Sequence, residues 1–336
     1  MIDSSGERES MAQNSKDKVV LAYERAKKFL PPKTINKRLK ISSQKISRWT
    51  KEKKCTLSTT KRCFLSCPAQ LSLAEQMRLR NYLFNPNYSN LPRNHIWALA
   101  RRKDLYVSVH TFYKYCRDIS GTPKVFELEK RETISIRAKR AFQILHMDST
   151  RITCKNGERI YVHFIMDNFS RNILGAVPSY SSKSEIVADN LKRVLMKYRL
   201  YNQPFELYCD DGPENKGYVM ELLKSDKRIK IKKIVASYEK RTSNNMIERW
   251  NNKFKYVILK KFAPKNFESL QELLPEMVKY NNNLFLPILK TLTPNEALRG
   301  MNYEELGIKL KIKEAKRLRI LQNQSVDCER LCMSQT

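Results

Sequence analysis

The sequence predicts an α/β fold, in which a mixed-sheet core is preceded by all-α domains. Up to about residue 120 the apolar residues recur at helical spacing, whereas after residue 139 short runs of Ile, Val, Phe and Tyr alternate with amphipathic segments. Lys and Arg outnumber Asp and Glu by 65 to 34 in 336 residues, and residues 1–140 hold 31 of the basic residues but only 12 of the acidic ones. We therefore expect helical domains that bind a polyanion, followed by a core of different character.

Composition excludes several classes of protein. A hydrophobic content of 41% supports a true core, so the chain is not disordered. No apolar run is long enough to span a membrane, and the first residues lack the plan of a signal peptide. We expect no membrane partner and a cytoplasmic, nucleoid-associated protein whose eight cysteines are reduced thiols. Cys63 and Cys67 could begin a zinc site, but no histidine with paired ligand spacing lies nearby, so two ordinary cysteines are the preferred interpretation.

The front of the chain is expected to contain a polar tail, residues 1–18, and a helix-turn-helix domain, residues 19–54. In the third helix of this domain Ile46 and Trp49 point inward. The side chains left to contact bases and phosphates in a major groove are Gln44, Lys45, Arg48 and Lys51. A basic helix that is merely solvated would show the same pattern.

A second helix-turn-helix domain is predicted over residues 70–120. Ser72 and Glu75 form the capping box of its first helix, and a second helix covers residues 92–103. Ser108 or Thr111 could cap the third helix. The outward-facing residues that we expect to contact DNA are His110, Thr111, Lys114 and Arg117. The alternative is a structural helical domain. Residues 121–138 have the composition of a linker.

Residues 139–300 are expected to form the core. Strands are predicted over residues 142–150, 158–170, 172–180, 205–212 and 229–237, and helices over 183–199, 219–226 and 245–262. Three consecutive strands followed by alternating helices and strands describe a mixed sheet.

Three acidic residues stand at the ends of core elements. Asp148 ends the first strand, Asp210 ends the fourth, and Glu248 lies near the start of the long helix. Each has an ordinary explanation as a turn former or a partner of the helix dipole. If strands one and four are neighbours, however, the three carboxylates converge at a sheet edge, where their repulsion favours bound cations. Oxygen ligands suit Mg²⁺ or Mn²⁺, and two such ions would support phosphoryl transfer.

The blocks HMDST, MDNFSRNILGA, CDDGPEN and SNNMIERWNNKFK, taken in this order, resemble the DDE transposase and retroviral integrase superfamily. They are most similar to bacterial insertion-sequence transposases. The resemblance implies an RNase H-like core in which Asp148, Asp210 and Glu248 are the catalytic, metal-binding carboxylates for two ions. It also implies double-stranded DNA as partner, both element terminal repeats and target, cleavage and strand transfer as activity, and a homo-multimer on DNA. Lys255 matches a position that contacts DNA. Asn252 could bind a phosphate or a metal-bound water, or could simply lie on a solvated helix face.

Some features depart from the family pattern or stay open. Asp211 stands where the family often has Asn or Gln, which leaves open which carboxylate turns inward. No His-His-Cys-Cys module precedes the core, so DNA recognition must come from the helical domains. His146 shares a strand face with Asp148 and is either an outer-shell partner of a metal ligand or a packed side chain. The basic C-terminal tail, residues 301–336, has no assigned role. The alternative functions are a hydrolytic nuclease of the same fold and a catalytically silent DNA-binding regulator.

Overall fold

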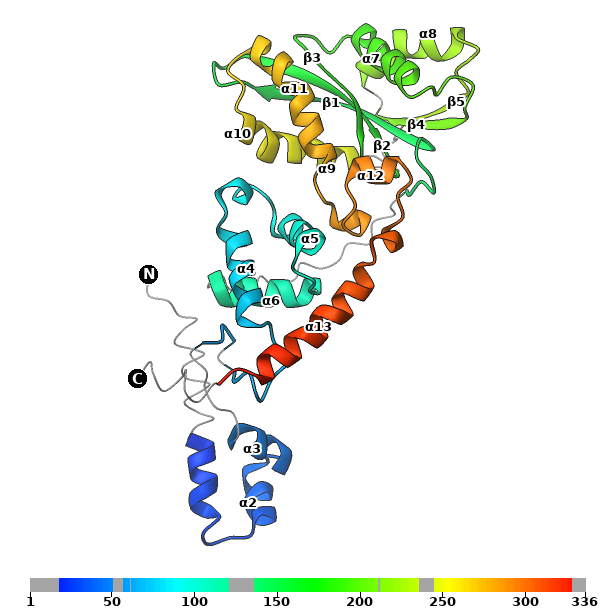
Figure 1. Cartoon of the computed structure of the whole chain (residues 1–336). Coiled ribbons are helices and arrows are strands. Elements are labelled where there is room, and N and C mark those ends of the chain that lie inside the picture. Colours follow the sequence, from blue (N-terminus) through cyan, green and yellow to red (C-terminus); the bar gives the residue numbers. More distant parts are fainter. Residues whose placement is uncertain are drawn as a thin grey trace. The chain divides into compact units, whose positions relative to one another are not determined.

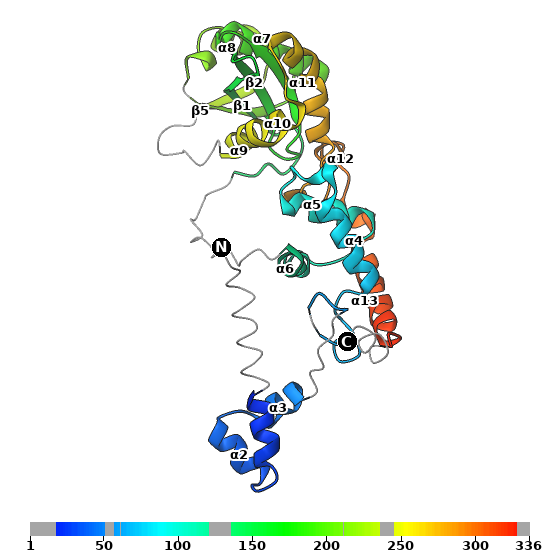
Figure 2. The same cartoon turned by 90° about the vertical axis from the view of Figure 1, so that its left-hand side faces the viewer.

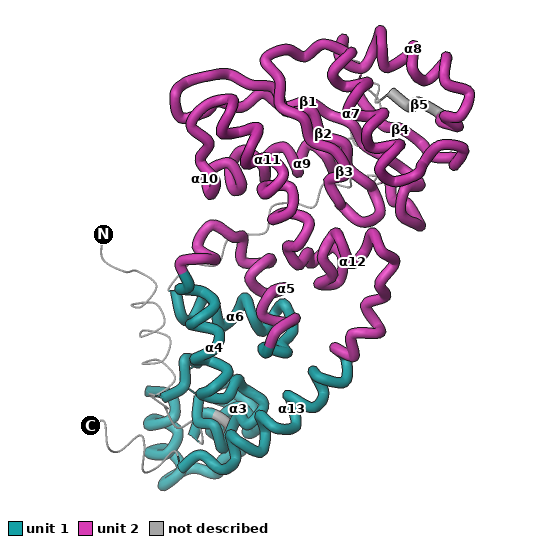
Figure 3. Tube along the Cα trace, turned by 45° about the horizontal axis from the view of Figure 1, so that its top comes forward, with its two compact units in different colours: residues 1–85, 104–127, 309–336 teal, residues 86–103, 128–308 magenta. Residues whose placement is uncertain are grey.

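The computed structural model describes residues 18–50, 57–60, 62–120, 136–210, 212–235 and 245–327. The chain divides into two compact units (Figure 3). The sheet unit comprises residues 86–103 and 128–308, and the helical unit comprises residues 1–85, 104–127 and 309–336.

The sheet unit is built on five strands in the order β3-β2-β1-β4-β5 (Figure 1). The first three strands form an antiparallel meander, and β4 and β5 continue the sheet in parallel with β1. Their bounds are β1 (Ile144–Thr153), β2 (Arg159–Asp167), β3 (Ile173–Ser179), β4 (Phe205–Cys209) and β5 (Ile231–Val235). This order and this mixture of directions confirm the α/β, RNase H-like mixed-sheet core.

Helices cover both faces of the sheet (Figures 1 and 2). One apolar cluster joins Leu145 and Met147 of β1 to α7 (Ser184–Lys197) and α8 (Tyr218–Ser225). A second cluster joins the opposite face to α9 (Asn245–Lys253), the π-helical segment η4 (Phe254–Ile258) and α11 (Phe267–Asn282). The remaining helical segments of the unit are η1 (Pro86–Tyr88), α5 (Arg93–Lys103), η2 (Pro213–Asn215), α10 (Leu259–Phe262), η5 (Pro287–Leu289), α12 (Pro294–Leu298) and η6 (Tyr303–Leu306).

Side-chain alternation decides which strand residues meet which helices. Leu145 and Met147 face α7, so His146 and Asp148 face the side of α9. Asp148 pairs with Phe164 of β2, which belongs to the cluster beneath α9. The alternation of residues along β1 in the sequence therefore predicts which of its side chains lies on each face of the sheet.

The first three helices of the helical unit form a small bundle of their own. Residues 18–26 are helical, and α2 (Pro32–Leu39) and α3 (Ser43–Thr50) follow. Tyr23, Ile35 and Ile46 are its buried residues, and Trp49 packs against them. The inward placement of Ile46 and Trp49 is as expected from the spacing. Residues 51–54 of the predicted domain and residues 1–17 lie outside the described residues.

The helices predicted for residues 70–120 are all present but belong to different units. The helical unit holds α4 (Leu73–Phe84) and α6 (Val109–Ser120), whereas α5 belongs to the sheet unit. There the guanidinium of Arg102 pairs with both carboxylate oxygens of Glu296, at 2.7 and 3.1 Å, and lies over the ring of Phe285. The capping box of Ser72 and Glu75 is confirmed.

The C-terminal region contains a helix, α13 (Ile308–Gln324). Arg319 and Asn323 on this helix are buried, although the sequence around them is rich in charge. Residues 309–327 therefore pack as part of the helical unit, in contrast to the unassigned tail that the sequence suggested. No described helix is both long and apolar enough to cross a bilayer. Residues 121–135 of the expected linker lie outside the described residues, and residues 136–138 are described.

Candidate active site

Asp148 and Asp210 come from neighbouring parallel strands. Ile144 pairs with Glu206 and His146 with Tyr208, and each aspartate lies two positions beyond the last of these pairs. Continuing the same register places Asp210 beside Asp148 where β4 ends. The condition on which the sequence argument depended, that strands one and four are neighbours, is fulfilled. The prediction that Asp148 ends its strand is wrong: Asp148 lies in the middle of β1, because β1 stays paired with β2 as far as Thr153.

The position of Glu248 follows from the packing of α9. Ile247 and Trp250 are buried, and the ring of Trp250 meets Phe164 edge to face at 5.2 Å between centroids. Phe164 is the cross-strand partner of Asp148, so this contact fixes the helix over the strand pair that carries the first aspartate. Glu248, one residue after Ile247 and in the first turn, is exposed.

Neighbouring carboxylates act electrostatically on Asp148. Burial and the charge of Asp210 raise the pKa of Asp148 from 3.8 to about 7; the Ser149 backbone N–H opposes this shift, and Glu248 and Glu214 add to it. The charges of Asp210 and Glu248, the other two predicted acids, thus reach Asp148, and so does the charge of Glu214 of η2. Glu214 was not expected from the sequence, because nothing in its spacing links it to the other acids.

Two asparagines orient the aspartates. Asn251 of α9 donates its amide N–H to Asp148 Oδ2 at 2.7 Å, while Ser149 N–H donates to Oδ1 at 2.8 Å. Asn215 donates to Asp210 Oδ1 at 2.6 Å. Among the described residues, Asn251 Oδ1 is buried without a hydrogen-bond partner. This acceptor without a partner belongs to the same side-chain amide whose nitrogen donates to Asp148.

Asn251 is the polar residue of α9 that sequence reasoning missed. Asn252, which was expected to act near the site, is exposed, and Lys255 lies partly exposed in η4. Spacing does not distinguish the two, because Asn251 and Asn252 follow Glu248 by three and four residues and both lie on its helix face. Asp211 lies outside the described residues, so the two neighbouring aspartates are not compared. Asp210 is the one whose contacts the structure describes.

The donor chemistry around Asp148 fits a hard divalent cation. Burial and the like charge of neighbouring carboxylates raise the pKa of Asp148, and Asn251 Oδ1 offers a further oxygen. Within the described ranges, no three acidic, histidine or cysteine side chains close on a common point. The two-ion arrangement that the sequence suggested therefore stays a prediction.

A partly buried lysine lies on the same helix as Glu248. Burial lowers the pKa of Lys253 to about 8, and its ammonium donates to Asn281 Oδ1 at 2.8 Å. Burial, together with the charge of Lys253, also lowers the pKa of His95 on α5 to about 3. Within the sheet unit, the start of α5 is thus close enough to α9 for their charges to interact.

His146 is fully buried. Its Nε2 lies 2.8 Å from the amide nitrogen of Asn168, and its ring lies 5.5 Å from that of Tyr208. These contacts favour the packed role over the outer-shell role. Asn168 belongs to the MDNFSRNILGA block, whose Asp167 accepts hydrogen bonds from Phe142 N–H and from Ser170. This block therefore builds the turn between β2 and β3 and does not contribute to the carboxylate cluster.

The residues predicted to contact DNA are located as follows. Gln44 and Lys45 are exposed on α3, with the ammonium of Lys45 5.1 Å from the ring of Trp49; the Arg48 side chain and Lys51 lie outside the described parts. On α6, His110 and Lys114 are exposed and Thr111 and Arg117 are partly exposed, opposite the buried Phe112 and Cys116. Ser108 caps this helix, because its hydroxyl accepts from Thr111 N–H at 3.1 Å. Their contact with DNA stays a prediction.

Comparison with known proteins gives structural likenesses alone. No protein-family profile matches the chain, and no curated protein matches it. A chain of the simian T-cell lymphotropic virus intasome in complex with PP2A regulatory subunit B56 gamma is similar over 63% of this chain and 72% of that chain, with 14% identity and a TM-score of 0.42.

Two structures of the HTLV-2 integrase catalytic core domain in complex with magnesium, a trimeric and a dimeric form, each match 48% of this chain and 99% of their own. Their identities are 16% and 17%, and their TM-scores are 0.37 and 0.38. Independently of these likenesses, the strand order defines an RNase H-like mixed-sheet core, in which β1, carrying Asp148, lies beside β4, which ends just before Asp210.

Proposed function

We propose that this chain is a DNA transposase of the integrase type, which cleaves DNA at the ends of an element and joins the freed 3′-hydroxyl to target DNA. One observation supports the proposal: the charges of Asp210, which directly follows β4, and of Glu248, on the helix packed over the sheet, act on Asp148 of the neighbouring strand β1. An RNase H-like sheet supports many functions, so the fold alone does not indicate this activity and the three acidic residues do.

In this proposal the three carboxylates hold Mg²⁺ or Mn²⁺, two ions per site. When bound, such ions activate the attacking oxygen and stabilise the leaving oxygen of a phosphodiester. Asn251 donates a hydrogen bond to Oδ2 of Asp148, and Asn215 donates one to Oδ1 of Asp210. Each bond orients its aspartate side chain. Fixed carboxylates matter because metal ligands act only within a narrow range of positions.

DNA recognition is assigned to the helical domains. The exposed faces of α3 and α6 carry amide, imidazole and ammonium groups, which can contact base edges and phosphates. The net charge of +31 gives a phosphate-binding term that should weaken steeply with salt. The partners proposed are terminal-repeat and target DNA, bound by a homo-multimer that holds two element ends together.

Product analysis separates this proposal from its alternatives. Purified protein is incubated with Mg²⁺ or Mn²⁺, a plasmid target and end-labelled duplexes taken from the DNA that flanks its gene. The wild type should produce labelled strands joined covalently to plasmid, and Glu248→Gln should produce none. Cleavage without joining would favour the hydrolytic nuclease. Binding with no metal-dependent chemistry in either protein would favour the catalytically silent regulator.

A further inference from the structure

Three arginines of the sheet unit lie around the turn between β2 and β3. Arg171 is part of this turn, Arg137 precedes β1, and Arg249 directly follows Glu248 on α9. Arg137 and Arg249 are exposed, and Arg171 is partly exposed. The proposed function gives none of the three a role, although one of them is the neighbour of a carboxylate assigned to the metal.

Hydrogen bonds hold Arg137 beside the turn. The side-chain amide of Asn168, in the same turn as Arg171, accepts from Ala138 N–H at 2.8 Å and donates to the Ile136 carbonyl at 3.2 Å. Arg137 stands between these two anchored residues. The chain ahead of β1 is therefore fixed against the turn three residues before Arg171.

A second set of hydrogen bonds links α9 to the same turn. Lys253, one helical turn after Arg249, donates to Asn281 Oδ1 of α11 at 2.8 Å. The next residue, Asn282, donates to Oδ1 of Asn172 at 3.0 Å, and Asn172 directly follows the arginine of the turn. The turn, α11 and the C-terminal part of α9 thus form one connected polar arrangement.

The charges of two of these arginines act on the third. Burial, followed by the charge of Arg137, lowers the pKa of Arg171 to about 10; the charge of Asp167 opposes this shift, and that of Arg249 adds to it. Asp167 supplies a single negative charge, and its Oδ2 already accepts from the N–H and the hydroxyl of Ser170. Three positive charges therefore share one carboxylate that has other partners.

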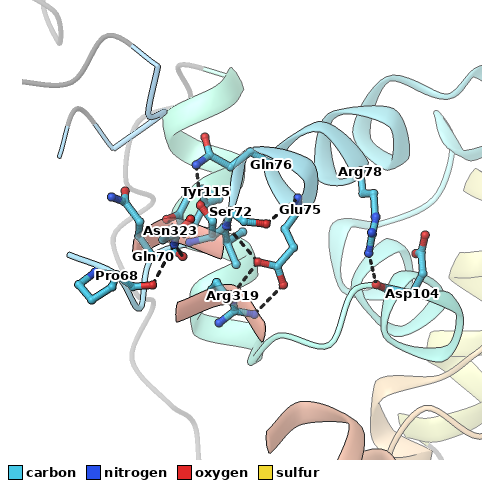
Figure 4. A network of polar contacts seen from close by, with 11 residues as sticks. Pro68, Gln70, Ser72, Glu75, Gln76, Arg78, Asp104, Tyr115, Arg319 and Asn323 are labelled. Atoms are coloured by element: carbon cyan, nitrogen blue, oxygen red, sulfur yellow. Dashed lines mark hydrogen bonds and ion pairs between the residues drawn. The ribbon is translucent and has the colours of Figure 1, made fainter. Parts of the chain in front are cut away.

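Arg171 also has a hydrogen-bond donor without an acceptor. Its Nη1 is buried and has no partner among the described residues. Arg319 of the helical unit shows the usual arrangement of a buried guanidinium, because it forms two hydrogen bonds to the Glu75 carboxylate, at 2.6 and 2.8 Å (Figure 4). Like charges held together and a buried donor without a partner are both unfavourable. A bound anion would offset the repulsion among the three arginines.

We propose that Arg137, Arg171 and Arg249 bind a phosphodiester group of the DNA strand whose reacting phosphate lies at the carboxylates. Arginine suits this ligand, because its planar guanidinium can donate two parallel hydrogen bonds to phosphate oxygens. Consecutive helix residues point about 100° apart, so the exposed side chains of Glu248 and Arg249 lie next to each other on α9. A strand with one phosphate near Glu248 would therefore bring a nearby phosphate to Arg249. That the ligand is DNA rests on the proposed function.

The test measures how DNA binding by the full-length protein depends on salt. The parent is Glu248→Gln with Mg²⁺, so that the duplexes from the DNA flanking the gene are bound but not joined. Each phosphate contact contributes about 0.9 to the slope of log Kd against log salt concentration. Arg137→Gln, Arg171→Gln and Arg249→Gln should each lower the slope by about this amount. Raising the salt from about 50 to about 200 mM should then weaken their binding about 3.5-fold less than that of the parent.

Two control variants separate this site from general charge. Arg193→Gln removes the same charge from an exposed position on α7, which covers the opposite face of the sheet, and should keep the parent's slope. Arg249→Lys keeps the charge and should also keep most of the slope. Unchanged slopes in all three site variants, or an equal fall in Arg193→Gln, would overturn the proposal. Stabilisation of the parent by inorganic phosphate with unchanged slopes would indicate a small-anion site, and would overturn the assignment to DNA.

Thermal unfolding without DNA separates binding from a structural role. Arg249→Gln removes a repelling charge from an exposed position, so its Tm should equal or exceed that of the parent. A Tm lower by more than about 4 °C would mean that Arg249 supports the fold, and would contradict the binding role. Joining is not needed for these measurements. If the wild type joins no DNA, the proposed function fails and the slopes still decide this site; if it joins DNA and the slopes are unchanged, this site alone fails.

Discussion

Replacing Arg319 with methionine should destabilise the helical unit strongly. The guanidinium binds both oxygens of Glu75, and the two side chains are only 9% and 10% exposed. Methionine keeps much of the apolar stem but removes the charge. The Glu75 carboxylate would then stay buried without its guanidinium partner, while the Ser72 N–H still donates to Glu75 Oε2 at 3.0 Å. Breaking a buried ion pair from one side costs about 3–5 kcal/mol.

Hydrogen exchange on α4 measures this loss where it occurs. Since about 1.4 kcal/mol corresponds to a factor of ten, a loss of about 3 kcal/mol should reduce the protection of the Leu73–Phe84 amides at least a hundredfold. Urea unfolding followed by tryptophan fluorescence would miss the effect, because none of the three tryptophans, Trp49, Trp97 and Trp250, lies in α4, α6 or α13.

Arg317→Met is the matched control, because Arg317 is exposed on the same helix and its replacement should change stability by less than about 0.5 kcal/mol. In the double variant Glu75→Gln/Arg319→Met the buried charge is gone, so protection should recover partly relative to Arg319→Met alone. If Arg319→Met stays within threefold of Arg317→Met, the buried pair does not hold α13 in place and the reasoning fails.

Three further predictions concern the site, the pH response and the limits of the helical unit. Asn251→Ala should lower the rate of DNA joining about 10- to 100-fold and raise the Mn²⁺ concentration required, while Asn252→Ala should leave both nearly unchanged; equal effects would remove the positioning role. His95 has a folded pKa of about 3 against an unfolded value of 6.5, so its contribution to stability is complete above pH 6.5 and is lost as the pH falls towards 3. Urea unfolding should show about 1–2 kcal/mol of loss between pH 7 and 5 that His95→Phe lacks, and an unchanged slope in this variant would refute the assignment. A fragment of residues 1–120, which lacks α13, should give weak amide protection in α4, and full-length protection there would show that α13 is dispensable.

Much of the core could be predicted because its determinants are local. The apolar runs of β1, β2 and β3 and the helical spacing of α7 and α9 indicate both the elements and their buried faces. The placement of Asp148 and Asp210 then depends on one long-range fact, the pairing of β1 with β4, and the structure supplies it.

The features that sequence reasoning missed depend on contacts between distant residues. The pairs Arg102–Glu296 and Arg319–Glu75 join residues nearly 200 or more positions apart, and no periodic pattern records them. They explain why α5 belongs with the sheet and why a charged C-terminal segment packs as a helix. The choice of Asn251 over Asn252 depends on a rotation of one residue about α9, which is finer than spacing arguments resolve.

In the proposed function, the carboxylates of Asp148, Asp210 and Glu248 perform metal-dependent DNA joining. The most direct measurement is the rate at which a labelled 3′-hydroxyl strand is joined to plasmid in Mn²⁺ by Asp148→Asn, Asp210→Asn and Glu248→Gln, with Asp189→Asn on the exposed face of α7 as the control. Each of the three site variants should fall at least about a hundredfold below wild type, with DNA binding retained and the control unchanged. If any one of these three site variants joins DNA at the wild-type rate, the catalytic role of its carboxylate is contradicted.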